Sequence, residues 1–246
     1  MWTREVLKNR AKGVLKDDYW KALIVSFLIM LTGGSHNSGS WGSGSAGGRG
    51  AAGGNAVSDF FNYNYKMIML VGATVLLIVL IRIFIGYMVE VGGRRYFIDL
   101  TFGSADIGVL GYGFGEGRYA NIFKTMLLRS IYIFLWTLLL IIPGIVKAYA
   151  YRMVPYILAE NPDMSSEKAI QLSNEMTMGE KLEIFVLDLS FIGWFILGAL
   201  FFGIGIFFVQ PYYDATNAEL YMKLREKAIS KGLVAKNELV PGNMKI

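Results

Sequence analysis

Five charged residues lie within long apolar stretches, where a charge needs a partner: Arg82, Arg129, Arg152, Asp188 and Asp214. Exposing one of them to hydrocarbon costs about 2.5 to 3.5 kcal/mol on insertion scales. With ~1.5 Å of rise per residue, all five are expected about 10 to 12 Å inside a membrane. The pattern predicts one polar layer that faces the cytoplasm, in which Arg152 bridges the carboxylates of Asp188 and Asp214. The expected role is either binding of a polar group, such as an anionic headgroup held by arginines, or locking of the helices.

Other residues that could do chemistry are scarce. The chain has one histidine, His36, and no cysteine, which excludes disulfides, thiolate nucleophiles and the usual zinc ligands. It has no HExxH or GxSxG motif, and the alternate glycines from 111 to 117 match neither GxGxxG nor a P-loop. We therefore expect no cofactor, no metal site and no catalytic residue. An intramembrane enzyme that uses only carboxylates is the least favoured class.

The composition indicates which environment positions these charges. Of 246 residues, 54% are hydrophobic and 17% charged, and the mean hydropathy is +0.44. These values are typical of membrane proteins. The net charge of +5 comes from Lys and Arg at the ends of the apolar stretches, a pattern that favours membrane topology over nucleic-acid binding. The sequence predicts an all-α, polytopic helical bundle in one integral membrane domain.

Six transmembrane helices are expected at about 18–33, 66–90, 122–142, 145–159, 181–201 and 204–222. Residues 2–17 place Leu7, Ala11, Val14 and Leu15 on one face and basic residues on another. This pattern predicts an amphipathic helix lying at the membrane interface, with a solvated helix packed on its neighbours as the alternative. The remaining segments are a Gly/Ser-rich extracytoplasmic loop (33–65), a cytoplasmic loop (91–121), a connector with a short helix (160–180) and a cytoplasmic tail (223–246).

Proline and glycine mark the expected hinges. Pro143 and Gly144 separate two apolar runs, and the pair predicts a reversal of the chain there. Pro211 leaves the carbonyl of Phe207 without its helical donor and is expected to bend the helix before Asp214. Residues 145–159 either cross the membrane or form a re-entrant segment.

Orientation follows from the basic residues. The N-terminal segment, the loop after residue 90, the connector and the tail are rich in Lys and Arg, whereas residues 33–65 contain only Arg49. The positive-inside rule therefore predicts a multi-pass cell-membrane protein with both termini in the cytoplasm. In a five-span alternative, residues 145–159 lie in the interface or are re-entrant, and the basic tail moves outside.

Several stretches resemble a known family. They are WTLLLIIPGIVKAYAYRMVPYILAENP from residue 136, LSFIGW from 189, PYYDATNAELY from 211 and RAKGVLKDDYWKAL from 10. Together they are similar to the integral membrane family catalogued as domain of unknown function 975. This resemblance implies a polytopic plasma-membrane protein of a bacterium, most often a Gram-positive one, and implies no particular activity.

Three functional classes follow from these observations. The first is transport or handling of a small molecule or lipid, or an accessory role in envelope homeostasis, through the polar intramembrane site. The second is a non-transporting membrane component that binds a partner, and the third is the intramembrane enzyme. The expected partners are membrane lipids and either a second copy of the chain or another membrane protein, with no nucleic acid. A cavity that reaches Asp188 and Asp214 favours the first class, and a dry, packed bundle favours the second.

Overall fold

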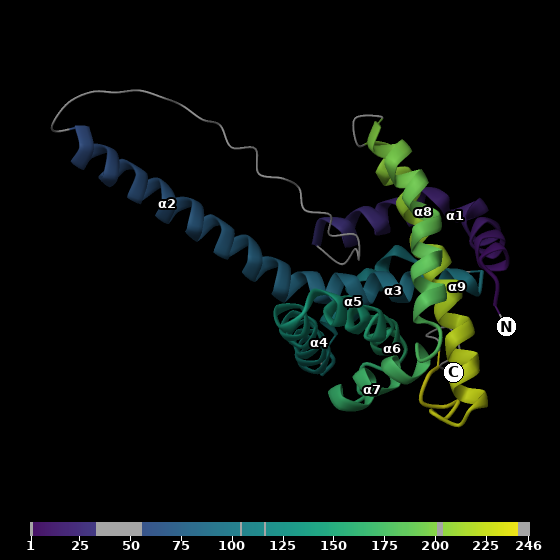
Figure 1. Cartoon of the computed structure of the whole chain (residues 1–246). Helices are drawn as coiled ribbons and strands as arrows, with labels where there is room; N and C mark the ends of the chain where they lie inside the picture. Colours follow the sequence, from purple (N-terminus) through teal and green to yellow (C-terminus); the bar gives the residue numbers. More distant parts are fainter. Residues whose placement is uncertain (1, 33–55, 104, 116, 201–203, 241–246) are drawn as a thin grey trace.

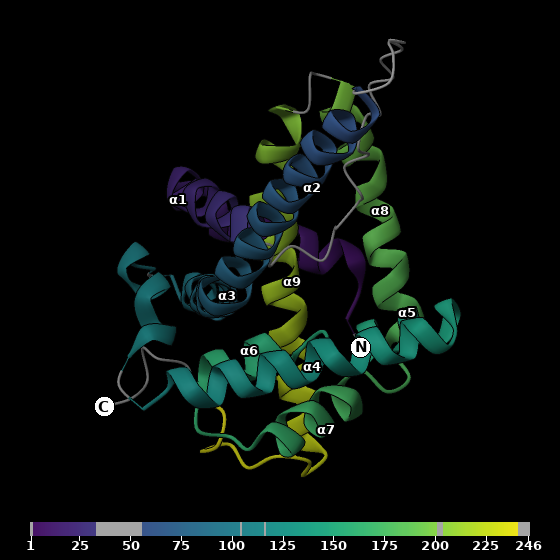
Figure 2. The same cartoon turned by 90° about the vertical axis from the view of Figure 1, so that its left-hand side faces the viewer.

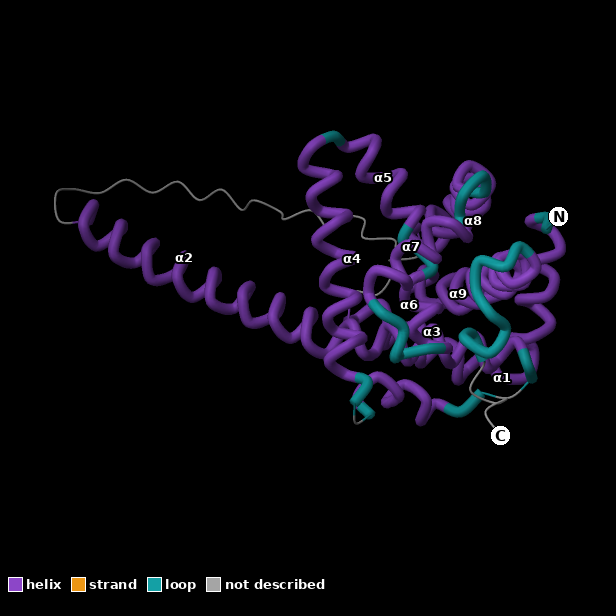
Figure 3. The backbone as a smooth tube through the Cα atoms, turned by 90° about the horizontal axis from the view of Figure 1, so that it is seen from below, coloured by secondary structure: helices purple, strands orange, loops and turns teal. Residues whose placement is uncertain are grey.

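The computed structural model describes residues 2–32, 56–103, 105–115, 117–200 and 204–240, and this part of the chain is helical without a strand. The predicted all-α class is therefore confirmed. Figures 1 and 3 show the elements, which are α1 (Arg4–Thr32), α2 (Ala56–Ile81), the π-helical turn η1 (Arg82–Gly86), α3 (Tyr87–Thr101), the 3-10 helix η2 (Ile107–Phe114), α4 (Tyr119–Leu139), α5 (Ile141–Ala150), α6 (Val154–Glu160), α7 (Ser166–Met176), α8 (Lys181–Leu200) and α9 (Ile204–Ser230).

Helix α3 lies at the centre of the core and packs against α1, α6, α9 and η2. Its Tyr96 and Phe97 are fully buried. Gly92 is needed for the contact with η2, because a Cβ there would lie 2.4 Å from the carbonyl oxygen of Leu110. The predicted cytoplasmic loop 91–121 therefore begins too early, since the helix continues to Thr101 and its residues face protein.

Helices α2 and α3 form one continuous rod through η1. The described side chains from Met67 to Arg82 are all exposed, whereas α3 is buried. Figure 1 shows α2 extending away from the other helices. The predicted span 66–90 is therefore part of a longer helix that begins at Ala56, inside the segment predicted as loop 33–65. Residues 33–55, with His36, lie outside the described residues.

Helix α1 changes direction at Asp18, whose backbone is non-helical (φ −116°, ψ 21°). This is the boundary expected between the helix of residues 2–17 and the first span. The first half contacts α8, where the Lys8 ammonium donates to the carbonyl of Ser190 (3.4 Å). Just after the change of direction, the Tyr19 hydroxyl donates to the carbonyl of Phe208 on α9 (2.8 Å). The apolar face of the first half is thus buried on protein, with Leu7 fully buried, and its placement at a membrane interface stays a prediction.

Helices α4 and α5 form a tight hairpin whose reversal lies at Leu140, which is extended (φ −156°, ψ 134°). The prediction that Pro143 and Gly144 make the turn is wrong by three residues. Pro143 lies in the first turn of α5, where a missing N–H costs nothing. Gly144 lets the two arms touch, because a Cβ on it would lie 2.6 Å from the Cα of Thr137.

The predicted span 145–159 is not one helix. Helix α5 ends at Ala150, turns follow, and Pro155 lies in the first turn of α6. At ~1.5 Å per residue, the ten residues of α5 measure about 15 Å, half the thickness of a hydrocarbon core. Residues 150–160 are buried in protein rather than exposed on the surface.

The connector and the second hairpin agree more closely with expectation. Ser165 caps α7 by accepting from the Lys168 amide (3.3 Å), and Ala169, Leu172 and Met176 are buried on one side of α7. Helices α8 and α9 then pack closely, because a Cβ on Gly198 would lie 2.7 Å from the backbone of Gly205. The tail begins as helix up to Ser230, as predicted.

Within the described residues, three helices are long and apolar enough to cross a membrane: Met67–Thr101, Tyr119–Leu139 and Lys181–Leu200. The most apolar stretch of each is largely exposed, and the buried residues gather where the helices meet, as in α3. Figures 1 and 2 show that α2, α4 and α8 extend from this common core in different directions.

Candidate functional site

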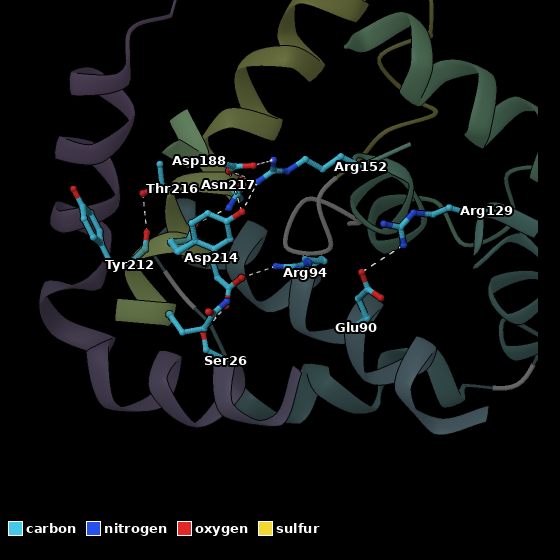
Figure 4. A network of polar contacts seen from close by, with 12 residues as sticks. Ser26, Glu90, Arg94, Arg129, Arg152, Asp188, Tyr212, Asp214, Thr216 and Asn217 are labelled. Carbon is cyan, nitrogen blue, oxygen red and sulfur yellow. Dashed lines mark hydrogen bonds and ion pairs between the residues drawn. The ribbon is translucent and has the colours of Figure 1, made fainter. Parts of the chain in front are cut away.

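A buried polar layer lies in the core where α3, α4, α8, α9 and the α5–α6 turn meet (Figure 4). We use the name for three ion pairs between described residues: Arg152–Asp188, Arg94–Asp214 and Arg129–Glu90. Charges in a low-dielectric interior need such partners, because unpaired burial is expensive. Four of the five residues predicted from the sequence belong to it: Arg129, Arg152, Asp188 and Asp214. The other two, Glu90 and Arg94, were not predicted.

The most elaborate pair joins the α5–α6 turn to α8. Arg152 binds Asp188 through two hydrogen bonds, Nη1 to Oδ2 at 2.6 Å and Nη2 to Oδ1 at 2.8 Å. The same Nη2 lies 2.8 Å from the Tyr213 hydroxyl and 2.7 Å from the Asn217 side-chain oxygen. Tyr213 and Asn217 are four residues apart on α9 and so project from one face of that helix. The predicted pairing of Arg152 with Asp188 is confirmed.

The predicted bridge from Arg152 to Asp214 is wrong. Asp214 Oδ1 instead accepts from Arg94 Nη1 at 2.7 Å, and its Oδ2 accepts from Ser26 Oγ (2.8 Å) and Gln210 Nε2 (3.2 Å). Tyr213, which donates to Asp188, and Asp214 are adjacent on α9 and lie about 100° apart around it, so the two carboxylates have different neighbours. Each carboxylate therefore has its own arginine.

The remaining pair is looser, and Arg82 takes no part in the layer. Arg129 Nη1 lies 3.6 Å from Glu90 Oε1, and its Nε donates to the carbonyl of Tyr151 at 3.0 Å. Arg82 is exposed in η1, and no ion pair joins it to another described residue. Its expected place in the layer is therefore wrong, because Arg82 lies at the outer end of η1, next to the exposed helix α2.

Glu90 and Arg94 were missed because both lie where the span was expected to end. They are four residues apart, so one face of α3 presents them both to the core. The signal in the sequence is that apolar residues recur at helical spacing on both sides of Gly92 and Gly93, since Val91 and Ile98 are seven residues apart, with no proline to stop the helix.

A second acidic site lies at the end of α6, outside the apolar spans. Glu160 Oε2 accepts from the Tyr221 hydroxyl and from Arg225 Nε, both at 2.8 Å. Its Oε1 is buried and has no hydrogen-bond partner among the described residues. Burial raises the pKa of Glu160 above its usual value, and nearby Arg225 offsets part of this shift.

Two hollows flank Asp188. The first, of ≈200 Å³, is lined by Ile145, Ala148, Tyr149, Arg152 and Asp188. The second, which we call the aromatic pocket, has ≈170 Å³ and is lined by Tyr149, Phe185, Asp188, Leu189, Ile192, Phe195 and Tyr213. Asp188 is 21% exposed there, whereas Asp214 is fully buried. Only one of the two predicted aspartates thus borders a cavity that a ligand could enter.

The three residues predicted as hinges all lie within helices. Pro143 and Gly144 lie inside α5, and Pro211 lies inside α9, which continues through it to Ser230. No group of His, Asp or Glu able to hold a metal ion occurs among the described residues. The residues around Asp188 can bind a ligand through charge, hydrogen bonds and aromatic rings.

The comparisons with known proteins identify a family for part of the chain. No curated protein and no solved structure matches the chain. Residues 138–228, which hold Arg152, Asp188 and Asp214, match the model of the family described as Protein of unknown function (DUF975), whereas the similar motif at residues 10–23 lies outside this range. The resemblance to that family is therefore confirmed for the part of the chain that forms both hollows.

Proposed function

We propose that this protein is a multi-pass cell-membrane protein that binds and handles a small molecule or lipid at the polar layer. The observation that carries the proposal is the position of Asp188. Its carboxylate is partly exposed between two hollows, and both open between helices whose outer side chains are apolar and exposed. A site with charge inside and apolar walls outside suits an amphipathic ligand.

The proposed topology has both termini in the cytoplasm. Helix pairs α4–α5 and α8–α9 are hairpins, so each returns the chain to the side from which it started. A re-entrant α5 would instead give the five-span alternative, which moves the basic tail outside. With one crossing before residues 33–55 and one in α2, the basic segments all fall on the same side, as the positive-inside rule requires. The polar layer then lies near the cytoplasmic ends of the spans.

Cysteine labelling tests the topology directly, because the chain contains no cysteine. A single cysteine at Ser43 should react with an impermeant reagent in intact cells, and one at Lys231 should react only after the membrane is opened. Labelling of Lys231→Cys in intact cells would show that the proposed orientation is reversed.

Mass spectrometry of the purified protein tests the binding function. The wild-type protein in mild detergent should retain a bound amphiphile, and Ala148→Trp, which fills the first hollow, should lose most of it. Ala73→Trp on the exposed surface of α2 is the matched control and should retain it. Equal retention by all three proteins would refute binding at this site.

A partner-binding component without ligand is the second candidate. The observations that favour it are the full burial of Asp214 and the apolar surface around α2, whose described side chains from Met67 to Ile81 all lie exposed. Crosslinking in native membranes followed by pulldown, together with a deletion strain scored for envelope defects, distinguishes the two candidates. A specific crosslinked protein with no bound amphiphile would favour this second function.

A further inference from the structure

Four of the side chains that line the aromatic pocket are aromatic rings. Tyr149 and Phe185 meet edge to face, with centroids 6.1 Å apart and planes at 82°. On the other side, Phe195 and Tyr213 do the same at 5.6 Å and 74°. Four rings from α5, α8 and α9 therefore surround one carboxylate, Asp188. Ring faces carry negative charge density and attract cations.

The ion pair between Arg152 and Asp188 also favours a cationic ligand. Asp188 is 21% exposed at the pocket, while its partner Arg152 is only 3% exposed behind it. The Arg152 side chain is held by Asp188, Tyr213 and Asn217 and is turned to the core. The accessible end of the pair is thus the negative one. An anionic headgroup held by spare arginines, one of the two roles expected from the sequence, does not fit this arrangement.

The hydrogen bonds that Asp188 already accepts indicate which kind of cation the pocket can bind. Asp188 Oδ1 accepts from Arg152 and Tyr213, and Oδ2 accepts from Arg152 and Tyr149. An ionised carboxylate offers about four acceptor positions, so all of them are filled. A primary ammonium group has three N–H donors, and the Tyr149 hydroxyl oxygen could accept from one of them, so the others would stay unsatisfied inside the pocket, which is costly. A quaternary nitrogen has no N–H donors and therefore carries no such cost.

We propose that the aromatic pocket binds a quaternary ammonium group, carried either by a lipid headgroup or by a soluble molecule. The charge of the ligand is attracted by Asp188 and by the rings of Phe185 and Phe195, because the Arg152 guanidinium already lies 5.6 Å from the Tyr149 centroid and 5.9 Å from that of Tyr213. The methyl groups of the ligand contact ring faces without needing a hydrogen bond. The pocket opens on the apolar side of α8, where Phe185 is 45% exposed, so a lipid tail could continue along the helix. This inference rests on the proposed ligand-binding function and specifies its ligand.

Titration calorimetry on the full-length protein in a neutral detergent tests the choice of ligand. Choline is the soluble probe, ethanolamine its primary-ammonium analogue and 3,3-dimethylbutanol its neutral isostere. Short-chain phosphatidylcholine and phosphatidylethanolamine form the lipid arm. We expect a quaternary probe to bind about tenfold or more tightly than its primary analogue and its neutral isostere. Binding of phosphatidylcholine alone would assign the lipid source, and binding of choline as well would assign the soluble one.

Variants of the rings locate the site. Asp188→Asn removes the counterion of buried Arg152 and can unfold the protein, so Phe185→Leu and Phe195→Leu carry the test. Each should weaken quaternary binding by about 3- to 10-fold. Phe134→Leu on α4, whose ring is exposed and outside the pocket, is the control and should bind as the wild type does.

Three results would overturn the inference. They are no binding of either quaternary probe, equal binding of quaternary and primary probes, and unchanged binding in both ring variants. If the wild-type protein nevertheless retains an amphiphile that Ala148→Trp loses, the proposed function stands and only the ligand class is wrong.

Discussion

Removing the carboxylate of Asp214 should strongly destabilise the protein. Asp214 is fully buried and accepts hydrogen bonds from Arg94, Ser26 and Gln210 at 2.7 to 3.2 Å. Asp214→Ala removes the anionic partner of a buried guanidinium, a change that typically costs about 3 to 5 kcal/mol. For a chain of this length, that corresponds to a fall in melting temperature of about 6 to 20 °C. Scanning fluorimetry in mild detergent measures it.

The control and a double-mutant cycle make this prediction specific. Asp106→Ala removes an exposed carboxylate and should change stability by less than about 0.5 kcal/mol. Combining Asp214→Ala with Arg94→Met should restore part of the loss, because the buried charge leaves together with its partner. Combining it with Arg152→Met should not. If Arg152 coupled to Asp214 more strongly than Arg94 does, the assignment of partners would be refuted.

Two further predictions concern the α4–α5 hairpin and the acidic site at the end of α6. Gly144→Ala should lower stability by about 1 to 3 kcal/mol, since its Cβ would press on Thr137, whereas Gly193→Ala, with open space around it, should be neutral or slightly stabilising in the same melting assay. The pKa of Glu160 is raised in the folded protein, so its contribution to stability is greatest below the unfolded value of about 4.5 and is lost as the pH rises through the folded pKa. Relative to Glu160→Gln, the wild-type protein should therefore melt at progressively lower temperature across that range, and a pH-independent difference between the two proteins would contradict the shift.

The sequence predicted best those features that depend on composition and local spacing. The helical class, the cap at Ser165 and the change of direction near Asp18 follow from apolar periodicity, turn chemistry and the onset of the apolar run. The pairing of Arg152 with Asp188 was also predictable, because a short connector joins their segments and a buried charge needs a partner.

Features that depend on tertiary packing were not predictable in the same way. The end of α3 was placed eleven residues too early because Gly92 and Gly93 look like a loop, whereas they are small so that η2 and α1 can approach. The partner of Asp214 depends on which helix α9 meets at that turn, and a single sequence contains no direct record of it. The reversal at Leu140 was hidden because a proline in the first turn of a helix looks the same in sequence as a proline that ends one.

The π-helical turn η1 connects α2 to α3 in one rod from Ala56 to Thr101, so a tilt of α2 can move α3. Its outer arm, α2, has 26 residues, which at ~1.5 Å each give about 39 Å, longer than the ~30 Å of a typical hydrocarbon core. A longer helix tilts to match the bilayer, and the tilt changes with bilayer thickness. The inner arm, α3, carries Glu90 and Arg94, so any tilt that η1 does not absorb is transmitted to both of their ion pairs. Bilayers of different acyl-chain length should therefore strain the polar layer to different degrees.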